Sequence, residues 1–213
     1  CEVKKRRFDG LIITGAPVEQ REFVVVDYWD ELVEIMDWAD GHVTSTFFIC
    51  WGAQAAMYHF YGLKKKLLPQ KLFGLYRHKV RNRREPLVRG FDDEFYAPHS
   101  RHTTVDAEEI RACSELTILA ESEEAGVFIA MAEEGRKVFV FGHPEYDRLS
   151  LEKEYLRDKN KGLDIQLPKD YFPENDSRNR PLLMWRAHAN TLYTNWINYY
   201  VYQLTPYVWE DEG

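Results

Sequence analysis

The chain has 213 residues and a formal net charge of −7, with 35 acidic and 28 basic side chains. This length suffices for one α/β domain, so we expect a single domain over residues 1–213. The acidic balance argues against nucleic-acid partners, and the absence of a long apolar run argues against a membrane partner. The three irregularly spaced cysteines predict neither a disulfide framework nor a metal site, and they favour a cytoplasmic location.

Strands and helices alternate in the first part of the chain. Apolar periodicity predicts strands over residues 8–14 and 44–50, and helices over about 28–40 and 51–61. Such alternation predicts a mostly parallel sheet with helices on both faces. Because a core strand follows almost at once from the first residue, we expect a further N-terminal segment that this sequence lacks.

The second part of the chain is less regular. Its predicted elements are, in chain order, short strands or extended loops near 72–80, 86–91 and 94–97, a short helix capped by Asp106, a strand over 116–121, a hairpin of 127–132 with 137–141, a helix over about 151–160 and a long aromatic helix over about 183–203. These elements complete the prediction of an α/β fold.

Two short basic clusters interrupt this pattern, at residues 64–66 and 81–84. Each is flanked by sequence typical of turns. One interpretation is solvated loop charge, and the other is a local anion site for a phosphorylated ligand.

Cys50 stands at the junction between a predicted strand and a predicted helix. The apolar run that ends at Ile49 is followed by a pattern of small residues from Trp51 onward. A cysteine at such a corner lies beside the positive end of a helix, where the thiolate is favoured over the thiol. Enzymes of the α/β class hold nucleophiles in this way. A buried core cysteine at the end of a strand is the alternative.

His143 is the histidine best placed to serve as a base for Cys50. It follows the predicted strand 137–141, and loops after the carboxyl ends of parallel strands line the ligand crevice. Glu145 lies two residues further on, where its carboxylate can orient the imidazole. The pattern predicts a Cys50–His143–Glu145 triad, against the alternative of a loop histidine with an incidental acid.

Several motifs together resemble a known family. The segments that carry the likeness are Thr14-Gly15-Ala16-Pro17, Cys50-Trp51, Ala97-Pro98-His99-Ser100-Arg101, Gly142-His143-Pro144-Glu145-Tyr146-Asp147, and the aromatic run from Asn195 to Gln203. The chain resembles the class I glutamine amidotransferase-like superfamily and, more closely, the homoserine O-acyltransferases of methionine biosynthesis. The resemblance implies a flavodoxin-like, three-layer sandwich. Amidotransferases usually carry glycine two residues before the nucleophile, whereas Phe48 stands here, which favours the acyltransferase branch.

The resemblance implies acyl transfer from a coenzyme A thioester to the hydroxyl of L-homoserine. Cys50 would form an acyl-enzyme, His143 would act as the base and Glu145 would orient it. The backbone N–H of Trp51 is the expected oxyanion donor, with a second donor in the turn of Gly15 and Ala16.

The resemblance also implies residues for substrate binding. Lys71, Ser100 and Arg157 match substrate-binding positions, with Arg157 holding the amino-acid carboxylate and Arg101 assisting. Glu19, together with Ser100, would set the acyl donor. A carboxylate at position 19 fills the pocket and repels a succinyl group, so acetyl-CoA is the expected donor.

The expected protein is therefore a homoserine O-acetyltransferase with no tightly bound cofactor, and the family suggests a homodimer. Three alternatives remain open at this point. They are a homoserine O-succinyltransferase, a glutamine amidotransferase-like hydrolase and a catalytically silent binding domain.

Overall fold

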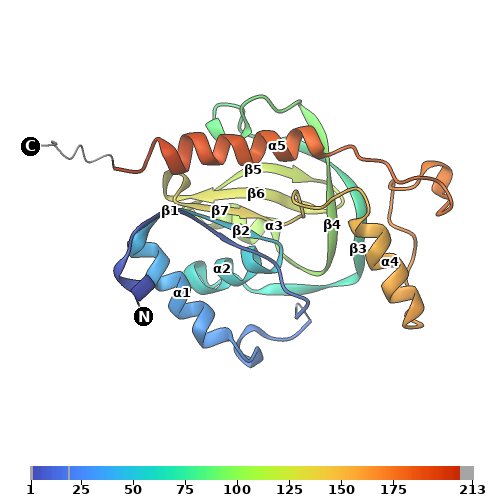
Figure 1. Ribbon diagram of the computed structural model, residues 1–213, viewed down its shortest axis with the longest axis horizontal. Coiled ribbons are helices and arrows are strands. Elements are labelled where there is room, and N and C mark those ends of the chain that lie inside the picture. Colours follow the sequence, from blue (N-terminus) through green and yellow to red (C-terminus); the bar gives the residue numbers. More distant parts are fainter. Residues whose placement is uncertain (1, 19, 207–213) are drawn as a thin grey trace, which may run out of the picture.

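A seven-stranded sheet with helices on both faces forms the centre of the molecule (Figure 1). The computed structural model describes residues 2–18 and 20–206. The strands are β1 (Phe8–Ile13), β2 (Val43–Ile49), β3 (Lys65–Val80), β4 (Glu94–Val105), β5 (Leu116–Ser122), β6 (Gly126–Ala132) and β7 (Lys137–Val140). The α-helices are α1 (Trp29–His42), α2 (Trp51–Tyr61), α3 (Ala107–Ala112), α4 (Ser150–Asn160) and α5 (Arg186–Asn195). No helix in these described ranges is long and apolar enough to cross a membrane.

The strands lie in the order β1-β2-β7-β6-β5-β3-β4. Parallel pairing joins β1 to β2 and β2 to β7, as the alternation of elements predicts. The pairings from β7 to β4 are antiparallel, so the expectation of a mostly parallel sheet applies to the β1-β2-β7 side alone. The reason is the short connections: tight turns join β5 to β6 and β6 to β7, and a tight turn can only reverse a strand.

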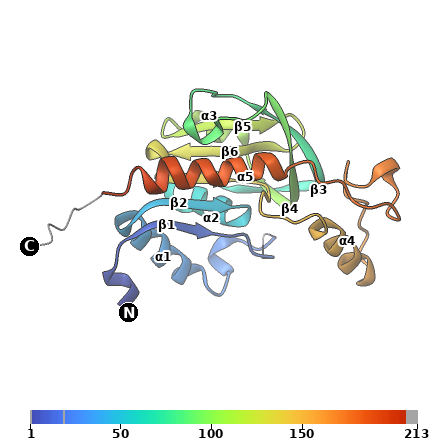
Figure 2. The same cartoon turned by 45° about the horizontal axis from the view of Figure 1, so that its top comes forward.

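Alternation along β2 divides the core into two layers. Phe48 packs with α1 and α2 residues on one face, whereas Phe47 and Ile49 pack with α5 and the π-helix η6 (Trp196–Tyr202) on the other. Figure 2 shows α5 lying across one face of the sheet while α1 lies beyond the other. The expected three-layer α/β sandwich is thus present.

Four predicted elements differ from the structure in extent or type. The segments predicted near 72–80 and 94–97 belong to the long antiparallel pair β3–β4, and Pro86–Val88 forms a 3-10 helix. Strand propensity does not predict the first half of β3, because proline and lysine are both disfavoured in strands and this half contains Pro69 and several lysines. The predicted aromatic helix begins only at Arg186 and becomes π-helical at Trp196.

The first turn of α2 packs so closely against the end of β1 that no side chain fits between them. A Cβ atom added at Gly52 would lie 2.7 Å from the carbonyl oxygen of Ile13 and 2.9 Å from that of Thr14. Only glycine allows this approach, which holds the first turn of α2 beside the loop that follows β1.

We expect Gly52→Ala to lower the free energy of unfolding by about 1–3 kcal/mol, because the new methyl group must displace backbone. Urea denaturation measures the change. Gly41→Ala is the matched control, since a Cβ there meets nothing within 4 Å. In helix α1 it should stabilise the protein by about 0.5–1 kcal/mol. Equal stability of the two variants would contradict the close approach.

Candidate active site

Cys50 occupies a strained corner between β2 and α2. Its φ of 51° and ψ of −113° are unusual for a non-glycine residue, a conformation that costs about 1–3 kcal/mol. Its backbone N–H donates to Val140 O at 2.7 Å, which ties the corner to β7. The residue is almost fully buried, yet it lines a cavity whose walls are partly polar. Cys50 therefore faces a ligand space and is not a simple core residue.

His143 reaches Cys50 from the end of the neighbouring strand. Because β2 and β7 are parallel neighbours, their carboxyl ends lie side by side, and the two side chains form a hydrogen bond. The imidazole Nδ1 lies 2.7 Å from Glu145 Oε1, which leaves Nε2 for the sulfur. The backbone N–H of His143 donates to Pro98 O at 2.9 Å. The structure thus brings the three predicted triad residues together.

The electrostatics of this group favour a charged imidazole. Burial lowers the pKa of His143, but the charge of Cys50, the hydrogen bond with Cys50 and the contact with Glu145 outweigh burial and raise this pKa to about 10. The imidazole of His143 is therefore expected to carry a proton on both ring nitrogens at neutral pH.

Tyr146 connects the triad to a second polar group. Its ring stacks on the imidazole of His143, with 4.2 Å between ring centroids and 18° between the ring planes. Its hydroxyl donates to Glu154 Oε1 at 2.5 Å. Burial, followed by the charge of Glu154, raises the pKa of Tyr146 and keeps the phenol protonated. The stacked ring restricts how the imidazole can turn.

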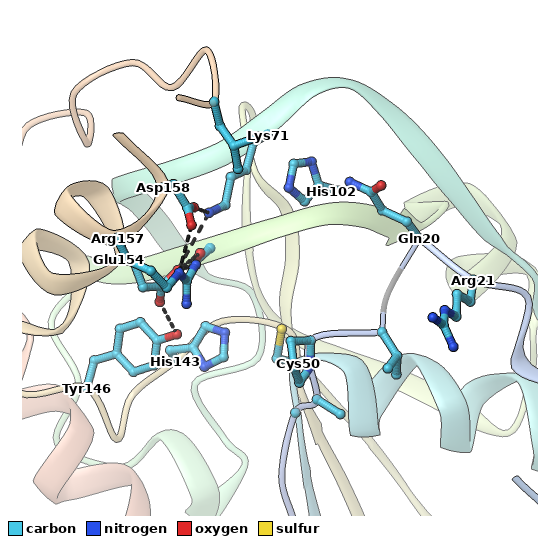
Figure 3. A pocket seen from close by; sticks show the side chains of 16 residues that line it. Gln20, Arg21, Cys50, Lys71, His102, His143, Tyr146, Glu154, Arg157 and Asp158 are labelled. Carbon is cyan, nitrogen blue, oxygen red and sulfur yellow. Dashed lines mark hydrogen bonds and ion pairs between the residues drawn. The ribbon is translucent and has the colours of Figure 1, made fainter. Parts of the chain in front are cut away.

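The cavity in front of Cys50 has a volume of about 650 Å³ (Figure 3). Loop residues after β1 form one side of it, and helix α4 with strands β3 and β4 forms the other. Its lining residues are Gly15, Ala16, Pro17, Val18, Gln20, Arg21, Cys50, Lys71, Ser100, His102, His143, Tyr146, Glu154, Arg157, Asp158 and Leu163. A space of this size suits small-molecule substrates.

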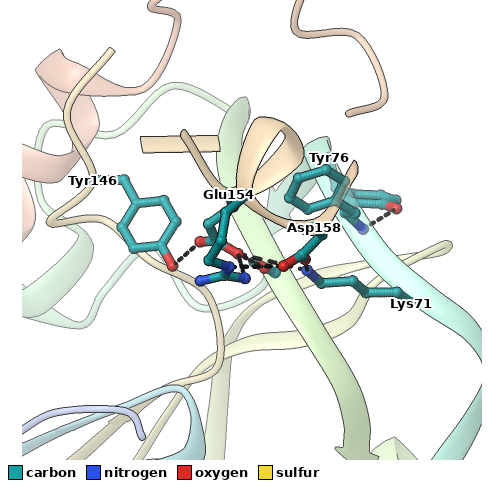
Figure 4. Close-up of polar contacts among 8 residues, drawn as sticks. Lys71, Tyr76, Tyr146, Glu154 and Asp158 are labelled. Carbon is teal, nitrogen blue, oxygen red and sulfur yellow. Dashed lines mark hydrogen bonds and ion pairs between the residues drawn. The ribbon is translucent and has the colours of Figure 1, made fainter. Parts of the chain in front are cut away.

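Charged side chains meet on the α4 side of the cavity, and Figure 4 labels Lys71, Glu154 and Asp158 among them. We call Lys71, Glu154, Arg157 and Asp158 the charge quartet. Lys71 Nζ lies 3.5 Å from Glu154 Oε2 and 3.4 Å from Asp158 Oδ2. Arg157 Nε donates to Asp158 Oδ1 at 2.7 Å. The quartet has a formal charge of zero, so it can receive a ligand with one positive and one negative group without leaving a charge unpaired.

Ser100 and Arg101 point to opposite faces of β4. Ser100 Oγ donates to Glu154 Oε2 at 2.6 Å and lines the cavity, as expected. Arg101 is fully buried, and its guanidinium donates to the carbonyl oxygens of Thr103 and Ala125 at 2.6 and 2.5 Å. Side chains alternate along a strand, so Arg101 cannot share the cavity with Ser100. The expectation that Arg101 assists in substrate binding is not supported.

The other predicted residues are placed as follows. Lys71 and Arg157 line the cavity, and Trp51 begins α2 directly after Cys50, where helix N–H groups have no partner within the helix. A Cβ added at Gly15 would lie 3.2 Å from Cys50 Cβ and 3.6 Å from Trp51 N, so the turn after β1 adjoins this N–H. Glu19 lies outside the described residues.

Sequence reasoning missed Glu154, Asp158 and Tyr146. The signal was present: Glu154, Arg157 and Asp158 are spaced i, i+3, i+4, which places them on one face of a helix. Nothing in the sequence says that this face meets Lys71, because the contact depends on the long β3–β4 pair. Among the described residues, no group of three or more His, Cys, Asp or Glu side chains could hold a metal ion.

Comparison with known sequences shows where the chain belongs. A family model described as homoserine O-succinyltransferase matches residues 1–207. The chain belongs to this family. It is 67% identical over 206 residues to a protein of Lachnoclostridium phytofermentans and 61% identical over 206 residues to one of Agathobacter rectalis, both named homoserine O-acetyltransferase. These alignments cover 97% of this chain and 68% and 66% of the two relatives.

Solved structures show the same fold. A glutamine amidotransferase of Thermotoga maritima superposes with a TM-score of 0.65 at 14% identity, over 89% of this chain and 77% of that chain. A glutamine amidotransferase of Methylobacillus flagellatus gives a TM-score of 0.66 at 12% identity, over 96% and 80%. The expected glutamine amidotransferase-like fold is confirmed for this member of the homoserine O-succinyltransferase family.

We expect Cys50→Ser to lower the pKa of His143 by more than about one unit, because it removes the charge that raises this pKa. NMR titration of the imidazole measures the shift. The raised pKa stabilises the fold fully below about pH 6.5, and this contribution is lost as the pH rises through about 10. The variant should therefore lose less stability than the parent protein between these pH values.

Cys113→Ser is the control for this titration, since Cys113 is a free cysteine distant in sequence from the site. It should leave the titration of His143 unchanged. An unchanged pKa of His143 in Cys50→Ser would contradict the coupling between the two side chains.

Proposed function

We propose that this protein is a homoserine O-acetyltransferase that moves an acetyl group from acetyl-CoA to the hydroxyl of L-homoserine through an acyl-cysteine. Relatives with this name at 67% and 61% identity support the reaction. The observation that carries the proposal is the placement of Cys50 and His143 in one cavity with a neutral charge quartet. A single catalytic domain, a cytoplasmic location and a homodimer stay predictions.

In the first half of the reaction, the Cys50 thiolate attacks the thioester carbonyl. A bond forms between the sulfur and the acyl carbon, the bond from that carbon to the coenzyme A sulfur breaks, and the departing thiolate takes a proton from the His143 imidazolium. The raised pKa of His143 means that this proton is in place when the donor arrives.

Acylation prepares the second half. The acyl-cysteine is neutral, so the charge of Cys50 no longer raises the pKa of His143, while burial continues to lower it. His143 is then a neutral base that removes the proton of the homoserine hydroxyl. The hydroxyl oxygen bonds to the acyl carbon, the bond from that carbon to the Cys50 sulfur breaks, and the thiolate–imidazolium pair returns.

Stabilisation of the oxyanion in both halves falls to backbone donors. We assign this role to the N–H of Trp51, the first residue of α2, where the helix dipole adds to the hydrogen bond. The turn of Gly15 and Ala16 borders the same point of the cavity and is the proposed source of a second donor.

The charge quartet suits a free amino acid. Homoserine carries an ammonium and a carboxylate, and the quartet offers a guanidinium and carboxylates that are themselves neutralised in pairs. We assign the carboxylate of homoserine to Arg157, which is half exposed, and the ammonium to Glu154. Ser100 and Tyr146 hold the Glu154 carboxylate in place, and Lys71 limits its net charge.

The acyl donor is the point at which two candidates remain. The matching family model is described as homoserine O-succinyltransferase, whereas the relatives above are named homoserine O-acetyltransferase. The residue type at position 19 is the reason to propose acetyl-CoA, since the Glu19 carboxylate would repel the carboxylate of a succinyl donor that bound near it. The structural likeness to glutamine amidotransferases, at 12–14% identity, supports the fold assignment and no assignment of activity.

The test is a product assay. The purified protein is incubated with L-homoserine and either acetyl-CoA or succinyl-CoA, and separately with glutamine. Release of free coenzyme A thiol and mass analysis of the amino acid report transfer. We expect O-acetylhomoserine with acetyl-CoA. Transfer from succinyl-CoA alone would overturn the donor, and ammonia from glutamine without ester formation would overturn the reaction class.

We expect Glu19→Gly to admit succinyl-CoA, because it removes both the bulk and the charge that oppose the longer acyl group. The ratio of kcat/KM for succinyl-CoA to that for acetyl-CoA should rise by at least about tenfold, which corresponds to about 1.4 kcal/mol. Glu22→Gly, three residues further along the chain, is the control. An unchanged ratio in Glu19→Gly would refute the role of Glu19.

We expect Arg157→Lys to raise the KM for homoserine about tenfold, because lysine keeps the charge but loses the planar pair of donors. The rate at which acetyl-CoA alone releases coenzyme A in a single turnover should stay the same. Arg178→Lys is the control, because Arg178 is exposed and pairs with Asp176. If Arg157→Lys slowed the single turnover and left the KM unchanged, the assignment would be wrong.

A further inference from the structure

The proposed acyl donor poses a charge problem in this cavity. Coenzyme A carries several negative phosphates, whereas the charge quartet presents two carboxylates whose cations are already paired. A polyanion placed there would meet Glu154 and Asp158 without a free cation to balance it. When the thioester of the donor is bound at Cys50, its phosphates must therefore lie on another side of the cavity.

The opposite side of the cavity is lined by one cation, Arg21. Figure 3 shows Gln20 and Arg21 on one side of Cys50, and Glu154, Arg157 and Asp158 on the other. Arg21 lines the cavity and is exposed to solvent. Within the described residues its guanidinium makes no ion pair. Pro17 and Val18 belong to the same loop as Arg21, line the cavity and offer it apolar surface.

One lysine, Lys65, adjoins Arg21. The Lys65 ammonium donates to the backbone carbonyl oxygen of Arg21 and lies 4.4 Å from the ring centroid of Phe23. This contact holds the loop of Arg21 against the start of β3. Lys64 precedes Lys65 in the chain and is exposed, and in the described structure it forms no ion pair. Lys66 is neutralised by Asp106 and Glu109. Arg21 and Lys64 therefore remain available to an anion.

Other basic or hollow regions fit a polyanion less well. In the cluster over residues 81–84, Arg81 pairs with Glu121 and Arg83 with Asp93. A second cavity of about 530 Å³ adjoins the first at Lys71, but its lining includes Asp158 and Asp164, and its Lys169 is paired with Glu124. Among the arginine and lysine residues that line these two cavities in the described structure, Arg21 alone forms no ion pair.

We propose that Arg21 and Lys64 bind the phosphates of the coenzyme A donor, with its thioester arm passing along Pro17 and Val18 to Cys50. This subsite rests on the proposed acyltransferase function. It divides the cavity into an anion side for the donor and a zwitterion side for the acceptor, with the nucleophile between them. The donor and the acceptor then reach Cys50 from opposite directions, which a transfer through an acyl-enzyme allows.

The test compares acetyl-CoA with acetyl-pantetheine, which has the same thioester arm and lacks the phosphates of coenzyme A. We expect Arg21→Gln to raise the KM for acetyl-CoA about tenfold, because it removes a charge-assisted contact, and to change that for acetyl-pantetheine less than about twofold. Lys64→Gln should also raise the KM for acetyl-CoA. Added salt should weaken the binding of acetyl-CoA but not that of acetyl-pantetheine. Arg77→Gln is the control, since Arg77 is exposed and pairs with Glu94.

Calorimetric binding of coenzyme A separates this subsite from the proposed function. If the protein makes O-acetylhomoserine and Arg21→Gln behaves like Arg77→Gln with both donors, the subsite is wrong and the function stands. If no donor is turned over but Arg21→Gln still weakens coenzyme A binding about tenfold, the subsite stands and the function is wrong. Equal rises in KM for both donors would also overturn the subsite, because a phosphate contact cannot affect a donor without phosphates.

Discussion

The interaction between Cys50 and His143 is the constraint on which the rest of the site depends. It exists because β2 and β7 are parallel neighbours whose carboxyl ends lie together, and the bond from Cys50 N to Val140 O holds that register. The strained backbone of Cys50 turns its side chain out of the core and into the cavity. Gly52 permits the corner by letting the end of β1 approach α2. The order of the strands, the positive φ of Cys50 and the glycine at position 52 thus together place Cys50 beside His143.

The remaining polar groups are arranged around this pair by charge. On one side, Tyr146 stacks on His143 and also donates to Glu154, so the base and the charge quartet share a side chain. The quartet is neutral as a whole, which suits a zwitterion. On the other side lies Arg21, which forms no ion pair within the described residues. A substrate pair composed of a small amino acid and a polyanionic thioester matches this division.

Local patterns in the sequence predict that Cys50, His143 and Glu145 lie together, but they predict the surroundings of these residues poorly. Cys50 and His143 each follow the end of a strand, and Glu145 lies two residues after His143. Their contact depends on the parallel pairing of β2 with β7, which the alternation of strands and helices along the chain predicts. Arg101 was misplaced, since its face on β4 depends on a register that a strand predicted over only 94–97 does not define. Glu154 and Asp158 were missed because their partner Lys71 lies on a strand obscured by Pro69 and lysines.

The measurement that tests this account most directly is peptide mapping of the protein after rapid mixing with acetyl-CoA in the absence of homoserine. The account predicts one acetyl group, on Cys50, that disappears on addition of homoserine as O-acetylhomoserine forms. Acid-quenched samples of the His143→Ala variant should show slower loss of the group. Formation of O-acetylhomoserine by a Cys50→Ala variant at the rate of the parent protein, or acetylation at another residue that discharges to homoserine, would contradict the account.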